Sequence, residues 1–412
     1  MNGRTIATTA LGQFKKARVA YLRLRGRTLD DVAEQRVVSG TSWDEFCDTL
    51  KSAGAAIVFP GTPTDPLTQA EGYRYLSRLT RAGLEAFVEY ADPHAPVLRR
   101  MIHETAKMGS DNPDNHYLNA SIDGTLDYRI IGTRGTVDYL GFGTQEGNYG
   151  EGGQMPTTGY VEAADLDIGP DGRFELILSA AEHEGNWLPM TPDTGLLIVR
   201  QTFADRETEV PADLRIELLE AAPGAGQAGR VAPAPGAQRV TPAPLTPAQL
   251  DAGLAKAGLL VAGASMLFAK WARDFQKHTN ELPMFDPERS TKAGGDPNII
   301  YYHSYWRLGP EEALVIESEI PECDAWNFQL DNHWLESLDY RHHRIHVNKH
   351  TASYRPDGSV RIVVAHRDPG LPNWIDTAGH DCGAMSFRWI RAATHPQPRT
   401  RVVSTAELAR MD

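Results

Sequence analysis

Residues 171–179 read DGRFELILS, and residues 357–365 read DGSVRIVVA. Each stretch opens with Asp-Gly, a dipeptide typical of β-hairpin turns because glycine adopts positive φ without steric cost. Apolar side chains then occupy every second position, beginning at Phe174 in the first stretch and at Val360 in the second. Such alternation places one face of a strand against a hydrophobic core. The two stretches therefore predict the same β-strand in two places.

Beyond these strands, both copies carry an Asn-Trp pair, then a glycine, then an arginine five residues after the glycine. These residues are Asn186, Trp187, Gly195 and Arg200 in the first copy, and Asn373, Trp374, Gly383 and Arg388 in the second. Because turn, strand, Asn-Trp, glycine and arginine follow in one order at nearly equal spacing, they indicate an internal repeat. The sequence thus predicts one all-β unit that occurs twice.

The texture of the sequence places these units within the chain. Frequent glycines and clustered β-branched and aromatic residues predict short strands of a sandwich or barrel over residues 116–220 and again over 295–395. Helical spacing of apolar residues predicts a mainly helical region over 1–115, with capping boxes at 42–45 and 68–71. Residues 396–412 are expected to form a loosely docked tail.

A linker and a helix separate the two units. Residues 221–247 are dominated by Ala, Pro and Gly, which cannot build a core. Thr246-Pro247 then predicts a helix start, with proline at the first helical position, and the helix is expected over 248–282. Because it is apolar on most faces between Leu254 and Met266, we expect it to be buried or to form a subunit interface, and membrane contact is not expected.

Charge and cysteine content exclude several classes of protein. The 412 residues carry a formal net charge of −13 at pH 7, and no basic stripe with interleaved aromatic residues stands out, so we expect no nucleic-acid partner. Three widely spaced cysteines without a CxxC pair argue against a disulfide framework and against common zinc motifs. The basic N-terminus lacks the apolar run of a signal peptide, so we expect a soluble, cytoplasmic protein.

The second copy, residues 357–391, resembles the C-terminal region of the family catalogued as domain of unknown function 1214. The family pattern is a DG turn, a strand, NWLP or a near variant, and a strand that ends in a basic and an aromatic residue. Residues 186–189, Asn-Trp-Leu-Pro, resemble this pattern too, so the chain is similar to two tandem copies of the unit. The resemblance implies duplicated antiparallel β-sandwich or jelly-roll-like units and homo-oligomerisation, and it implies no reaction.

The loop after Asn-Trp differs between the copies. The first copy has the stiff, mostly apolar stretch 188–194, whereas the second has Asp376, His380 and Asp381 in the same place. Ionisable groups on a loop held by a rigid scaffold are typical of functional sites, although a solvated loop explains them equally. His380 could act as a general base oriented by Asp376 or Asp381, and His346, or His366 with Asp368, could serve instead. We expect His380 and Asp376 to lie in one pocket with at least one further polar residue from the second unit. The candidates for that further residue are His346, His366 and Arg388.

Histidines crowd the stretch before that loop. His342, His346 and His350 would share one face of a strand, because their separations are even. Three imidazoles on one face could bind zinc, iron or copper. The interleaved Arg344 and Lys349 are instead typical of a solvated edge strand, and the spacing matches no compact metal motif. We therefore assign no cofactor and keep a divalent metal as a hypothesis.

Further residues are candidates for contact with a small molecule. The aromatic ones could stack on a ligand or fill the core, and the polar ones could line a pocket entrance or form Asx turns. The complete set of predicted substrate-binding residues is Asn373, Trp374, Arg388, Trp334, Tyr305, Asp111 and Asn115.

Two functions follow from these patterns. The first is an enzyme that acts on a small organic molecule by hydrolysis or elimination/addition, with the His and Asp groups of the second β unit. The alternative is a non-catalytic ligand-binding or assembly protein built on a duplicated β-sandwich, with the helix at 248–282 as an interface. The chain lacks a Gly-x-Ser-x-Gly elbow, a P-loop and a well-placed dinucleotide fingerprint, which removes most support for serine-hydrolase, kinase and Rossmann classes.

Overall fold

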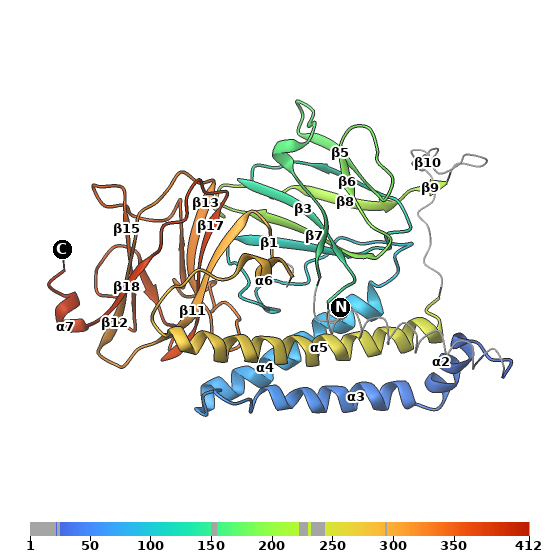
Figure 1. The fold of residues 1–412 in the computed structure, drawn as a ribbon, viewed down its shortest axis with the longest axis horizontal. Coiled ribbons are helices and arrows are strands. Elements are labelled where there is room, and N and C mark those ends of the chain that lie inside the picture. Colours follow the sequence, from blue (N-terminus) through green and yellow to red (C-terminus); the bar gives the residue numbers. More distant parts are fainter. Residues whose placement is uncertain are drawn as a thin grey trace, which may run out of the picture.

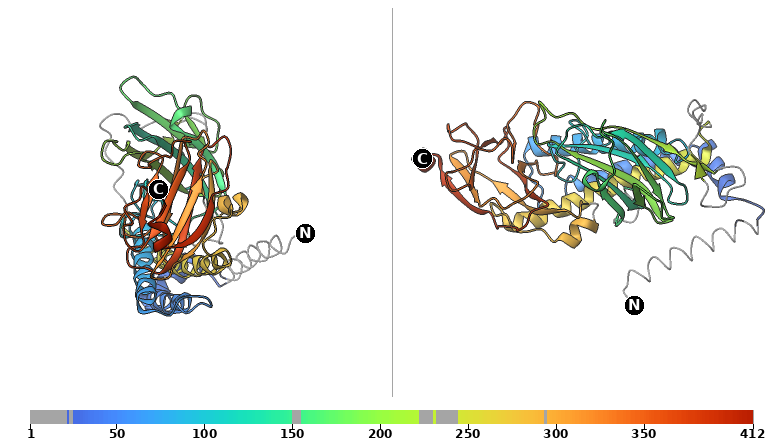
Figure 2. Two further views of the ribbon diagram at one scale, coloured as in Figure 1. Left: turned by 90° about the vertical axis from the view of Figure 1, so that its left-hand side faces the viewer. Right: turned by 90° about the horizontal axis from the view of Figure 1, so that it is seen from above.

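Helices that precede and follow the first β unit in the sequence form one layer of the molecule. The computed structural model describes residues 22, 25–149, 155–221, 230–231, 244–292 and 295–411. The helices are α2 (Leu29–Val38), α3 (Thr41–Ala53), α4 (Pro66–Leu84), α5 (Pro247–Phe275), α6 (Pro287–Lys292) and α7 (Thr405–Leu408). Helices α3, α4 and α5 lie along one side of both β units, and α5 passes beneath each of them (Figures 1 and 2).

Local chemistry explains where α5 begins. The Thr246 side chain accepts a hydrogen bond from the Gln249 backbone N–H, and the Gln249 side chain accepts one from the Thr246 N–H, so the two form a capping box. Pro247 occupies the first turn, where its missing N–H costs nothing. The helix start predicted at Thr246-Pro247 is therefore confirmed.

The capping boxes predicted at 42–45 and 68–71 are wrong, because both stretches lie inside helices. Helix α3 begins after Gly40, and Ser42 donates instead to the Asp251 carboxylate on α5 at 2.6 Å. Helix α4 is capped by Asp65, whose side chain accepts from the Thr68 N–H at 2.9 Å. The side chain that caps α4 thus lies three residues before Thr68, and α3 has no side-chain cap, since Gly40 offers only its carbonyl to the Trp43 and Asp44 N–H groups.

Small residues let α5 pack closely on the other helices. A Cβ added at Gly253 would stand 2.3 Å from the Phe87 carbonyl oxygen, and one at Gly83 would stand 3.2 Å from the Ala257 Cα. Leu260 is only 1% exposed and belongs to the core shared with α3 and α4. Within the described residues, Pro247–His278 is the single helical stretch long and apolar enough to cross a membrane, a property that core helices of soluble proteins share.

Each β unit consists of two four-stranded sheets that enclose one hydrophobic core. The strands of the first unit are β1 (Asn115–Ser121), β2 (Tyr128–Thr133), β3 (Tyr139–Glu146), β4 (Thr157–Glu162), β5 (Arg173–Ser179), β6 (Trp187–Pro189), β7 (Thr194–Thr202) and β8 (Asp213–Leu218). Those of the second are β11 (Ile299–Arg307), β12 (Glu312–Ser318), β13 (Ala325–Leu330), β14 (His346–Asn348), β15 (Val360–Ala365), β16 (Trp374–Asp376), β17 (Cys382–Ile390) and β18 (Arg399–Ser404). The predicted linker at 221–247 lies mostly outside the described residues, apart from the short β9 (Glu220–Ala221) and β10 (Arg230–Val231).

The two units have the same strand order. The sheets run β1-β7-β3-β4 and β6-β5-β2-β8 in the first unit, and β11-β17-β13-β14 and β16-β15-β12-β18 in the second. Separate cores lie between the sheets of each unit, so the units are two sandwiches rather than one sheet system. The predicted duplicated β-sandwich is therefore confirmed. It is not wholly antiparallel, because β5–β6 and β15–β16 are parallel pairs.

The Asn-Trp pairs hold these parallel strands in place. The Asn373 amide donates to the carbonyls of Ser353 and Arg361 and accepts from the Ser353 N–H, and the Trp374 indole donates to the Ala365 carbonyl at 2.9 Å. Asn186 and Trp187 make the corresponding contacts in the first unit. Asn373 and Trp374 are predicted to bind substrate, but the Asn373 amide and the Trp374 indole N–H bond to backbone carbonyls of their own unit.

The predicted tail belongs to the second unit. Residues 399–404 form β18, which pairs with β12 along six residues, and Val403 is buried against that sheet. The prediction of a loosely docked end is wrong here, because an edge strand that buries a single valine leaves only a weak sequence pattern.

Candidate functional site

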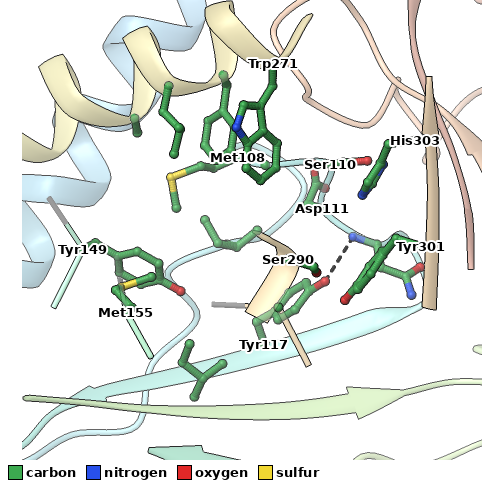
Figure 3. Close-up of a pocket in the computed structure, with 18 of the residues that line it drawn as sticks. Met108, Ser110, Asp111, Tyr117, Tyr149, Met155, Trp271, Ser290, Tyr301 and His303 are labelled. Carbon is green, nitrogen blue, oxygen red and sulfur yellow. Dashed lines mark hydrogen bonds between the residues drawn. The ribbon is translucent and has the colours of Figure 1, made fainter. Parts of the chain in front are cut away.

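A cavity of about 650 Å³ lies where the two β units meet the helical layer. Its walls come from β1 and β7 of the first unit, β11 and β17 of the second, helix α5, and the loop around Gly109 (Figure 3). Cavities of this size at the junction of two structural units commonly hold small molecules. We therefore treat it as the candidate site.

Two matching Tyr-Arg pairs form the polar part of the wall. Tyr117 on β1 lies directly opposite Arg200 on β7, and Tyr301 on β11 lies opposite Arg388 on β17. All four line the cavity. Because β1 and β7 correspond to β11 and β17 in the strand order, the cavity is lined by the same two positions of each repeat.

Arg388 is held by a ring of hydrogen bonds. Its guanidinium, 2% exposed, donates to Asn327 Oδ1 at 3.2 Å, to Gln329 Oε1 at 2.5 Å and to the Ser110 carbonyl at 2.6 Å. Behind it, the Asp331 carboxylate accepts hydrogen bonds from Ser110 Oγ and from Gln329 Nε2. The arginine and the buried acid are thus bridged by Ser110 and by Gln329.

Burial acts strongly on the ionisable groups around the arginines. It raises the pKa of Asp331 to about 7, although its hydrogen bonds with Ser110 and Gln329 favour the carboxylate. Burial likewise raises the pKa of Tyr301 to about 12, against the effect of Arg200 and Arg388. For Arg200, burial is outweighed by the Asp296 carboxylate and nearby tyrosines, which raise its pKa. Tyr301 therefore lies within the field of both arginines.

The opposite wall is mainly apolar. Helix α5 contributes Leu260, Leu267 and Trp271, and Met108 and Phe268 complete the surface (Figure 3). Among the described lining residues, the cations are Arg200, Arg388, Lys270 and Lys292, and the single carboxylate is Asp111. Asp111 accepts from the Ser337 N–H and hydroxyl at 2.9 and 2.8 Å. The cavity thus combines an excess of positive charge with an apolar wall.

The loop that closes the cavity has an unusual backbone. Gly109 and Ser110 have φ of 66° and 61°, in the left-handed region that a serine rarely adopts. A Cβ at Gly109 would stand 2.9 Å from the Phe268 ring, so glycine fits there for space as well as conformation. Strained backbone of this kind tends to occur at functional sites.

The predicted acid–base residues lie outside the lining of this cavity. His380 Nε2 contacts Glu71 Oε2 at 3.0 Å, whereas Asp376 contacts His343 at 2.8 Å. His346 contacts Asp114 at 3.1 Å, and His366 contacts Thr377 Oγ1 at 2.9 Å. None of the four predicted catalytic residues, His380, Asp376, His346 and His366, lines the 650 Å³ cavity. His380 and His366 lie close together, because the His380 ring also contacts the Thr377 carbonyl at 3.1 Å, and an acid–base role for these residues stays a prediction.

The predicted histidine face is also absent. His342 lies in a turn, His346 begins the short β14, and His350 lies in the next turn, so the three do not share a strand. In the part of the chain that the structure describes, no group of three His, Cys, Asp or Glu side chains is placed to hold a metal ion.

The substrate-contact predictions divide into two groups. Arg388, Asp111 and Asn115 line the cavity. Trp334 and Tyr305 are buried, with Trp334 donating to the Thr68 carbonyl at 2.9 Å and Tyr305 bonded to His333 at 3.0 Å. The sequence analysis missed other lining residues, which are Tyr117, Arg200, Tyr301 and His303. The arginine that both repeats share is the sequence signal that marks this cavity.

The fold and the cavity together define a duplicated β-sandwich protein with an amphipathic cavity at the junction of its halves. Residues 313–394 match the model of the family described as "Protein of unknown function (DUF1214)", so this part of the chain belongs to that family. The match covers most of the second unit, and the first unit shares its strand order with the second.

A solved structure of a similar protein agrees with this fold. A putative uncharacterized protein from Burkholderia cenocepacia is 50% identical, with 90% of this chain and 99% of that chain covered and a TM-score of 0.84. The VPA0106 protein from Vibrio parahaemolyticus is 13% identical, with 80% of this chain and 98% of that chain covered and a TM-score of 0.44. No curated protein matches the chain.

Proposed function

We propose that the cavity between the β units binds a small amphipathic organic acid. The observation that carries this proposal is the pair of buried arginines, Arg200 and Arg388, which line one cavity from equivalent positions. A guanidinium binds a carboxylate through parallel N–H donors, and the bond is strong where water is excluded. The tyrosine hydroxyls beside each arginine can donate to the same anion.

The apolar wall supports the second half of the proposal. Leu260, Leu267 and Trp271 offer a surface for a hydrocarbon chain or ring, and burial of such a group favours binding by about 0.8 kcal/mol per methylene. A volume of about 650 Å³ suits a ligand of this kind. A small organic molecule is therefore the partner that we propose, as the sequence predicts.

Paired probes test the proposal. Octanoate and octanol share an alkyl chain and differ in charge, so the arginines should favour octanoate, which should raise the thermal unfolding temperature more than octanol. Arg200→Gln should weaken octanoate binding at least tenfold by titration calorimetry. Arg173→Gln is the control, because that arginine is exposed at the start of β5. Equal binding of octanoate by all three proteins would contradict the proposal.

A hydrolase or lyase is the second candidate, and Ser110 with Asp331 is the observation that favours it. A carboxyl with a pKa of about 7, hydrogen-bonded to a cavity-lining hydroxyl on strained backbone, suits a general base. We expect p-nitrophenyl octanoate to be hydrolysed by the native protein and not by Ser110→Ala, while octanoate binding persists in both. Equal turnover in the two proteins would remove this candidate.

A further inference from the structure

His303 is a cavity residue that the proposed carboxylate contact does not use. It lies on β11 two residues after Tyr301, so the two side chains point to the same face of the sheet. The residue is 9% exposed and lines the cavity (Figure 3). Its remaining exposed surface therefore faces the space that a ligand would occupy.

Aromatic rings fix the imidazole in place. The Tyr301 ring stacks on it at a centroid distance of 5.3 Å, the Phe275 ring stacks on it at 5.6 Å, and the Phe285 ring meets it edge-on at 5.2 Å. Among the described residues, none forms a hydrogen bond with either ring nitrogen. A buried polar group without a partner is costly, and such groups in proteins usually find one. At His303, the ring faces the cavity, so a ligand or water there is the source of that partner.

The charge of the imidazole decides which ligand group fits. Burial, together with the Arg388 charge, lowers the pKa of His303 to about 3, so the ring is neutral at physiological pH. A neutral imidazole offers one donor and one acceptor nitrogen. A hydroxyl matches it, because it donates and accepts, whereas a second carboxylate would gain no charge attraction.

We propose that the ligand is a hydroxylated organic acid, with its carboxylate at the arginines and its hydroxyl on His303. This inference rests on the proposed function. Arg388 lies opposite Tyr301, and His303 is its diagonal neighbour, which places their Cα atoms about 7–8 Å apart. Two side chains that reach into the cavity from such positions meet groups only a few bonds apart. The hydroxyl is therefore on carbon 2 or 3 of the acid.

Titration calorimetry with octanoate, 2-hydroxyoctanoate and 3-hydroxyoctanoate tests this assignment. The native protein should bind one hydroxy acid roughly fivefold to tenfold more tightly than octanoate, the value of one added hydrogen bond. His303→Phe should bind octanoate as tightly as the native protein and lose the preference. His303→Gln, which keeps a donor and an acceptor, should retain part of it.

The octanoate affinity separates the two proposals. If native protein binds octanoate without preferring either hydroxy acid, or if His303→Phe keeps the preference, the hydroxyl assignment is overturned and the carboxylate site stands. If the native protein binds none of the three acids, the proposed function fails and this inference with it. Unchanged thermal unfolding of the variants confirms that they fold.

Discussion

The two β units agree in architecture and in the residues that line the cavity, and they differ in the loop after Asn-Trp. In the first unit that loop is stiff and mostly apolar. In the second, His380 reaches Glu71 on α4, with the two side chains 11% and 10% exposed. The loop that differs therefore fixes the second unit to the helical layer. The shared Tyr-Arg positions, not the loop, lie at the candidate site. In a duplicated protein, a difference between repeats can mark how one copy is docked.

The equivalent glycines should give the largest effect. A Cβ at Gly383 would stand 2.1 Å from the Asp331 carbonyl oxygen, and one at Gly195 would stand 2.6 Å from the Gly147 carbonyl oxygen. We expect Gly383→Ala to lower the free energy of unfolding by about 3 kcal/mol and Gly195→Ala by about 2 kcal/mol. Urea unfolding measures both, with Gly263→Ala on α5 as control, since a Cβ there meets nothing within 4 Å. If Gly383→Ala and Gly263→Ala lower the free energy of unfolding equally, the close backbone approach at Gly383 does not matter for stability.

The two asparagines should differ next most strongly. Asn373 is 1% exposed and has φ of 55°, whereas Asn186 is only partly buried, although both make the same backbone contacts. Loss of buried hydrogen-bond partners is costlier than loss at the surface. We expect Asn373→Ala to cost about 2–3 kcal/mol and Asn186→Ala about 1 kcal/mol in thermal unfolding. A larger loss of stability for Asn186→Ala than for Asn373→Ala would show that burial does not set the strength of these contacts.

The buried acid distinguishes the second unit's half of the cavity. Asp331 has a pKa raised to about 7, so it loses its proton as the pH rises through that value and then offsets the charge of Arg388. Octanoate should therefore bind severalfold more tightly at pH 6 than at pH 8. Asp331→Asn should remove the dependence, while Arg200→Gln should keep it at weaker affinity. An identical pH profile for native protein and Asp331→Asn would exclude this coupling.

The smallest effect concerns the docking loop. Although burial opposes it, Glu71 raises the pKa of His380, so the folded state binds the imidazole proton more tightly than the unfolded state. The stabilisation is complete below the unfolded pKa near 6.5 and is lost as pH rises through the higher folded pKa. Native protein should therefore lose more unfolding free energy than His380→Gln between pH 6 and pH 8.5. Parallel pH profiles would mean that the Glu71 contact adds no stability.

The fold could be predicted from the sequence further than the site could. Alternation in residues 171–179 and 357–365 is a local signal, so it gave the strand, the repeat and the sandwich. Strand β18 escaped prediction because it buries one valine. The cavity joins Tyr117, Arg200, Tyr301 and Arg388, which are far apart in the chain, and only strand pairing brings them together. The residue types in the loop could not show that His380 would form an ion pair with Glu71, which lies 309 residues away in the chain.

The matching Tyr-Arg pairs bear on how such a protein could arise. Equivalent surfaces that face each other are the contact of a symmetric homodimer. A single-unit ancestor would build this cavity only by pairing two identical subunits, at a rate and yield set by concentration. Joining both units in one chain makes the encounter intramolecular. It also frees each half to mutate alone: where the first half has Asn119, the second has His303, a choice that no homodimer could make.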